Sequence, residues 1–116
     1  MPLKFLKLQD RMLKNFSAQK LYLNAVKNKK RLKFAEPVIA KAPHWAYMYA
    51  MDVIKGPWPE AEPYIMKNAY WAYMYARFIL KKRWPEAEPF IKHGDFTSWY
   101  EYKKTFNIKD NATKTT

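Results

Sequence analysis

The sequence predicts an all-α protein: a short solenoid of helical hairpins with atypical N- and C-terminal units. Residues 35–60 align with residues 61–86 without a gap, and 15 of the 26 aligned positions are identical. The 116-residue chain has only two glycines, and 49% of its residues are hydrophobic, so one packed domain is expected. Because a single hairpin cannot bury its apolar face alone, such a chain stacks several copies of it.

Residues 1–34 are predicted to form two basic helices that act as a leading or capping unit. The first helix places the basic residues Lys4, Lys7, Arg11 and Lys14 on one face and the apolar residues Phe5, Leu8, Met12 and Phe16 on the other. The second passes through Leu21, Tyr22, Ala25 and Val26 and ends in a cluster of Lys27, Lys29, Lys30, Arg31 and Lys33. Residues 29–31 stand two periods before residues 81–83, so residues 9–34 are interpreted as a diverged unit.

Residues 35–106 are predicted to contain the repeats, each a short helix followed by a longer one. Pro63 opens a short helix, and Glu62, because it precedes a proline, is expected to lie outside helical geometry in a turn over 58–62. Asn68 caps a longer helix that extends over residues 69–83. In the earlier copy, Pro43 occupies the first helical position.

The last copy departs from the pattern. Gly94 and Asp95 are expected to supply the break between its two helices and the cap of the second. Residues 107–116 are polar and are expected to form a flexible tail.

The aromatic residues recur with the repeat. Trp45, Tyr47 and Tyr49 reappear 26 residues later as Trp71, Tyr73 and Tyr75, and this spacing favours a core that packs one repeat against the next. An alternative concerns Tyr47 and Tyr73, which lie between the Trp and Ala positions. If their rings reach the surface, they could stack on unpaired bases or bind a protein partner.

The sequence offers no catalytic or metal site. Cysteine is absent, and neither His44 nor His93 has a helical partner suited to zinc. His44 occupies a position where the next repeats have Tyr70 and Phe96, so a packed ring is expected there. The carboxylate pairs Glu60/Glu62 and Glu86/Glu88 recur with the repeat, whereas a catalytic pair is needed only once. We therefore expect a protein that is not an enzyme and has no cofactor.

The net charge of +12 is concentrated in the N-terminal third, where residues 1–34 hold ten basic residues and one acid, Asp10. Such an imbalance indicates a polyanionic partner, namely RNA or another nucleic acid, although an acidic protein surface could satisfy the same charge. No apolar run approaches the roughly 20 residues of a membrane-spanning helix, so a soluble, intracellular protein is expected. The amphipathic first helix would also suit an anionic membrane surface, but it is expected to cover the open end of the solenoid instead, so no membrane partner is expected. The predicted contact residues are Lys4, Lys7, Arg11, Lys14, Lys27, Lys29, Lys30, Arg31, Lys33, Arg77, Lys81, Lys82 and Arg83, with Tyr47 and Tyr73 as stacking residues.

The segment WPEAEPYIMKNAYWAYMYARFILKKRWPEAEP resembles a short helical repeat of predicted bacteriophage proteins. The resemblance covers residues 35–91 and implies a phage protein in the cytoplasm of a bacterial host. The resulting hypothesis is a non-catalytic binding module for RNA or a ribonucleoprotein that interferes with a host defence system. The alternative is a protein inhibitor that occludes an acidic or nucleic-acid-binding site of a host protein. The oligomeric state stays open, since similar repeats could also stack between chains.

Overall fold

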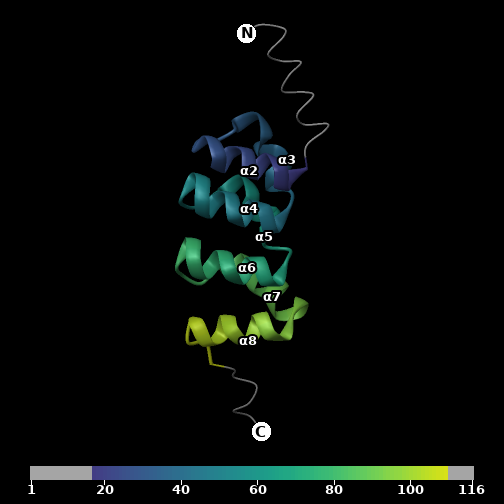
Figure 1. Cartoon of the computed structure of the whole chain (residues 1–116). Helices are drawn as coiled ribbons and strands as arrows, with labels where there is room; N and C mark the ends of the chain where they lie inside the picture. Colours follow the sequence, from purple (N-terminus) through teal and green to yellow (C-terminus); the bar gives the residue numbers. More distant parts are fainter. Residues whose placement is uncertain (1–16, 110–116) are drawn as a thin grey trace, which may run out of the picture.

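The computed structural model describes residues 17–109, and within this range the chain is helical and contains no strand. The all-α prediction is confirmed. Four helices, two of them lengthened by a π-helical turn, lie side by side like rungs, and three shorter helices connect them (Figure 1). The rungs are α2 (Ala18–Asn28), α4 (Pro43–Tyr49), α6 (Ala69–Tyr75) and α8 (Phe96–Thr105), and the connecting helices are α3 (Glu36–Ala40), α5 (Glu62–Ile65) and α7 (Glu88–Gly94).

Two of the rungs are extended by a π-helical turn. The segment η2 (Ala50–Ile54) continues α4, and η4 (Ala76–Leu80) continues α6. The predicted helix over 69–83 therefore ends three residues early. It ends there because Lys81 adopts the left-handed conformation, with φ 57°.

The last hairpin omits this π-helical turn. Tyr75 precedes the left-handed Lys81 by six residues, whereas Tyr102 precedes the left-handed Asn107 by five. A π-helical turn accommodates one extra residue, so α8 reaches an equivalent end as a plain α-helix. The last hairpin compensates for the residue that α8 lacks with one additional residue before α8, at Gly94, the predicted break. A side chain there would place its Cβ 2.9 Å from the Cβ of Ala69, and only glycine allows α7 to end so close to α6.

Each short helix is preceded by one turn of 3-10 helix. These turns are η1 (Lys33–Ala35), η3 (Pro59–Ala61) and η5 (Pro85–Ala87). The prediction that Glu62 lies outside helical geometry is wrong, because its φ of −57° and ψ of −40° make it the first residue of α5. The bias against helical geometry before proline is overcome because η3 leads the chain directly into the helix, where the Glu62 carboxylate accepts a hydrogen bond from Tyr75.

Alanines and aromatic residues contribute much of the core, as predicted, together with Leu21 and the isoleucines Ile39, Ile65 and Ile91. The side chains of Trp58 and Trp84, at the bends of the hairpins, are almost fully buried. Alanines spaced four apart on the rungs are completely buried and let the helices approach closely; they are Ala46, Ala50, Ala72 and Ala76.

One buried hydrogen-bond arrangement occurs in all three hairpins. A tyrosine hydroxyl near the end of a rung donates to a glutamate at the start of the preceding short helix and accepts from a backbone N–H. The donor pairs are Tyr49–Glu36 at 2.6 Å, Tyr75–Glu62 at 2.6 Å and Tyr102–Glu88 at 2.8 Å. The backbone donors are Leu32, Trp58 and Trp84. Burial raises the pKa of Tyr102 to about 12. One carboxylate of each predicted pair thus holds the hairpin together.

The helix caps and the C-terminal tail agree only in part with the sequence prediction. The side chain of Asn68 accepts a hydrogen bond from the backbone N–H of Trp71 at 3.1 Å, as predicted. Asp95 occupies the cap position of α8, but its carboxylate accepts from the hydroxyl of Ser98 and from no backbone N–H. Ile108, expected in a flexible tail, packs against the core and donates its backbone N–H to the carbonyl of Lys103 at 2.8 Å.

Two predictions concern the N-terminal segment and membrane crossing. The first amphipathic helix, with Phe5, Leu8, Met12 and Phe16, lies outside the described residues. Among helices of residues 17–109, none has the length and apolarity that crossing a membrane requires.

Candidate nucleic-acid interface

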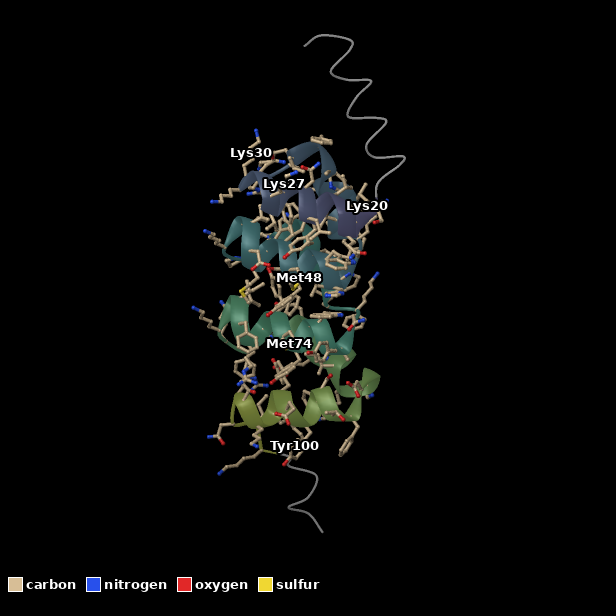
Figure 2. All side chains as sticks on the ribbon, in the orientation of Figure 1. Lys20, Lys27, Lys30, Met48, Met74 and Tyr100 are labelled. Atoms are coloured by element: carbon tan, nitrogen blue, oxygen red, sulfur yellow. The ribbon has the colours of Figure 1, made fainter. Side chains whose placement is uncertain are left out.

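The rungs end along one edge of the molecule, and lysine occupies the same place in three of them. Lys29, Lys55 and Lys81 follow α2, η2 and η4 at intervals of 26 residues, with φ of 54°, 62° and 57°. Figure 2 shows Lys27 and Lys30 toward this end of α2, with Lys20 at the opposite end. We call this surface the basic edge and define it as Lys27, Lys29, Lys30, Lys55, Arg77, Lys81 and Lys82, all of them exposed.

Lysine is an unfavourable choice for a left-handed position. A residue with a Cβ loses about 1–2 kcal/mol in this conformation, and glycine is the usual residue there. Glycine does follow Lys55 directly, as Gly56, but it does not occupy the left-handed position. A positive charge at a helix C-terminus is favourable by about 0.3–1 kcal/mol, yet a lysine in the last helical turn would supply it without strain. Three strained lysines therefore indicate a use for their side chains.

Two notches separate these lysines. The first notch, of about 510 Å³, is lined by Ala25, Val26, Lys29, Asp52, Val53 and Lys55. The second notch, of about 190 Å³, is lined by Met51, Lys55, Gly56, Phe78, Ile79 and Lys81. Each notch has one left-handed lysine from each neighbouring hairpin, and Lys55 belongs to both.

The two notches differ in chemistry. Asp52 brings a carboxylate to the first notch, where it accepts a 2.5 Å hydrogen bond from Tyr22. Burial, followed by this hydrogen bond, raises the pKa of Tyr22 to about 12. The equivalent position in the second notch is Phe78, whose ring is 41% exposed and lies 4.9 Å from the guanidinium of Arg77.

The proposed stacking residues Tyr47 and Tyr73 are not at the surface. Each is only 5% exposed, so the expectation that their rings are available to a base is wrong. The rungs pack too closely to leave these rings free, and the ring of Tyr47 lies 5.4 Å from that of Trp71 in the next hairpin. Tyr73 instead accepts a 2.6 Å hydrogen bond from Arg77 through its hydroxyl.

Two of the predicted phosphate contacts are held by carboxylates. Arg31 forms two hydrogen bonds, of 2.7 and 2.8 Å, with Glu36. Arg83 forms the same pair of bonds with Glu88, both at 2.9 Å. Burial alone would raise the pKa of Glu36, but the hydrogen bonds from Arg31 and Tyr49 outweigh it and lower this pKa below its usual value. These two arginines thus carry compensated charge and hold the bends of their hairpins.

The remaining predicted residues divide into three groups. Lys27, Lys29, Lys30, Arg77, Lys81 and Lys82 belong to the basic edge. Lys33 lies apart from it, in a hollow that it shares with Glu36, Lys41 and Glu60. Lys4, Lys7, Arg11 and Lys14 lie outside the described residues.

Sequence reasoning missed Lys55 and Phe78. Lys55 stands alone beside Gly56, so a search for clusters of basic residues passes over it, although its spacing of 26 from both Lys29 and Lys81 was visible. Phe78 was overlooked because it breaks the repeat, with Asp52 at the equivalent position.

The histidines lie in unlike places. The ring of His44 stacks on Trp45 and on Trp71 of the next hairpin, with centroid distances of 4.2 and 4.4 Å, so the position holds a packed ring as expected, although the residue is exposed. His93 is exposed near the end of α7. In the part of the chain that the structure describes, no group of three or more histidines and carboxylates is placed to hold a metal ion.

Comparisons with protein-family models, with curated proteins and with solved structures gave no match.

Proposed function

We propose that this chain is a non-catalytic helical-repeat binding protein whose basic edge contacts the phosphates of RNA or another nucleic acid. The observation that carries the proposal is the recurrence of lysine at three successive left-handed helix ends, Lys29, Lys55 and Lys81. Lysines that neutralise phosphates release condensed counterions, so an edge with several of them binds polyanions in a salt-dependent way.

We further infer that the stacked hairpins form a short repeat solenoid. This is supported by two features that recur along the chain, the left-handed helix end and the tyrosine–glutamate bond. Stacking places equivalent residues of successive hairpins in a row, which suits a ligand that is itself a chain of regularly spaced charges. The proposal includes the setting that the resemblance implies, namely a phage protein that interferes with a host system.

The test is a comparison of two double variants that remove the same charge from opposite edges. Lys55→Gln with Lys81→Gln changes the C-terminal ends of two rungs. Lys41→Gln with Lys67→Gln is the control. These two lysines are also 26 residues apart and exposed, but each stands just before the start of a rung.

Binding of the full chain to a fluorescent oligouridine is measured by anisotropy from about 50 to 200 mM salt. We expect the first variant to bind more weakly and to lower the slope of log K against log salt by about 1.4, as two lost contacts with a single strand would. We expect the control to keep the wild-type slope. Equal losses in both variants would mean that net charge, and not the basic edge, determines binding.

The same protein distinguishes the alternative function. If no oligonucleotide binds, and one acidic host protein from a bacterial lysate remains bound after nuclease treatment, the proposal of nucleic-acid binding is wrong. The inhibitor hypothesis then takes its place.

A further inference from the structure

We propose that the second notch, between Lys55 and Lys81, holds one unpaired nucleobase stacked on Phe78 and Arg77, so that the basic edge selects single-stranded over double-stranded nucleic acid. The inference rests on the proposed function, because the phosphates on the basic edge bring the base to the notch. It adds a base-binding position to an edge that otherwise recognises charge alone.

Phe78 lines the notch, Arg77 lies beside its ring, and both residues are exposed. The Phe78 ring is 41% exposed, and the Arg77 guanidinium lies 4.9 Å from its centroid. Aromatic rings and guanidinium planes are the groups on which proteins stack unpaired bases. The pair thus supplies the stacking chemistry that the sequence predicts for Tyr47 and Tyr73.

The guanidinium of Arg77 is fixed before any ligand arrives. Its Nη1 donates a 2.6 Å hydrogen bond to the hydroxyl of Tyr73, whose side chain is buried in the core. An arginine that is already immobilised loses less conformational entropy on binding than a mobile one. Tyr73 is therefore a positioning residue for this site.

The notch has the size and lining that one base requires. Its volume of about 190 Å³ lies below the range of about 300–1,000 Å³ typical of pockets for drug-sized ligands. Met51 and Ile79 add apolar surface, while Lys55 and Lys81 stand on either side for the phosphates that flank the base. A duplex cannot fill the notch, since its bases are stacked inside the helix.

The first notch provides an internal comparison. The residue of the first notch equivalent to Phe78 is Asp52, whose carboxylate would repel a phosphate. The residue equivalent to Arg77 is Met51, which has no guanidinium and lines the second notch. The first notch therefore lacks both the ring and the guanidinium. The described part of the chain offers this stacking pair at one notch only.

The test uses Phe78→Leu, with Phe90→Leu as the matched control. Phe90 is 42% exposed on α7 and does not belong to the basic edge. Affinity for a fluorescent oligouridine and for an RNA duplex of equal length is measured on the full chain. We expect Phe78→Leu to weaken binding of the single strand by about five- to a hundredfold, to leave the duplex unchanged, and to keep the salt slope because no charge is lost. We expect Phe90→Leu to match the wild type on both ligands.

A second variant keeps the charge and removes the planar group. Arg77→Lys should weaken binding of the single strand at least severalfold with the wild-type salt slope, and its exposed position protects the fold. If neither variant affects the single strand while Lys55→Gln with Lys81→Gln still lowers the salt slope, the base site is wrong and the basic edge stands. If Phe78→Leu weakens single strand and duplex equally, the base site is again wrong. If the wild type binds neither RNA, both proposals fail.

Discussion

The hydroxyl of Tyr75 donates a 2.6 Å hydrogen bond to Glu62, thirteen residues earlier, and so ties the end of a rung to the start of the short helix before it. The same hydroxyl accepts a 2.8 Å bond from the backbone N–H of Trp58. One oxygen atom thus serves both a buried backbone N–H and a half-buried carboxylate. The arrangement recurs in three hairpins, so each of them is tied by the same polar contact.

Tyr75→Phe should lower the free energy of unfolding by about 1–3 kcal/mol, because it leaves the N–H of Trp58 buried without an acceptor. Urea denaturation followed by circular dichroism measures the change. Tyr70→Phe, at a tyrosine that is 46% exposed, is the control and should stay within about 0.5 kcal/mol of the wild type. A similar loss in both variants would contradict the importance of the buried hydroxyl.

Lys55→Gly and Lys81→Gly should each raise the free energy of unfolding by about 0.5–1 kcal/mol, because glycine relieves left-handed strain. Each should at the same time weaken binding to oligouridine. Thermal unfolding and anisotropy on the same preparations measure the two effects. If the glycine variants are less stable than the wild type, the lysines serve the helix ends and the argument from strain is lost.

Acid should destabilise the first hairpin through Glu36. Its pKa in the folded chain is lowered from 4.5, so the contribution of the ionised carboxylate to stability is present above pH 4.5 and is lost as the pH falls through the lower folded value. Glu36→Gln should therefore show a smaller loss of stability between about pH 6 and pH 3 than the wild type, measured by urea denaturation. Glu86→Gln, at an exposed carboxylate, should follow the wild-type curve.

Ala42→Asn should stabilise the protein by about 1 kcal/mol by adding a cap to α4. Ala42 has φ −107° and ψ 101°, close to the −107° and 114° of Asn68, which caps α6 in the next hairpin. The reverse change, Asn68→Ala, should cost a similar amount. Thermal unfolding measures both changes. An unchanged melting temperature in Ala42→Asn would show that asparagine does not cap α4 as Asn68 caps α6.

Periodicity and local chemistry were enough to predict the helices. Pro43 and Asn68 start their rungs as expected, and the buried alanines lie where close approach was predicted. These features depend on neighbours within one turn of a helix or on the spacing of the repeat. They can therefore be read from a single sequence.

The site was predicted less well because it depends on how hairpins pack. Nothing local to Tyr47 or Tyr73 shows that the adjacent rung covers their rings. Arg31 and Glu36 pair across a bend, and the sequence alone does not show that the bend brings them together. Lys55 became notable only once its left-handed backbone was seen.

The left-handed lysines also relate the number of repeats to the number of cations that a ligand could contact. From Lys29 to Lys81, each 26-residue step adds one left-handed helix end that carries a lysine, whereas the next such end is Asn107. Inserting or deleting a whole segment would lengthen or shorten the row of cations without changing the geometry at any step. If such a chain binds a polyanion, its avidity would depend on how many of these lysines the ligand is long enough to reach.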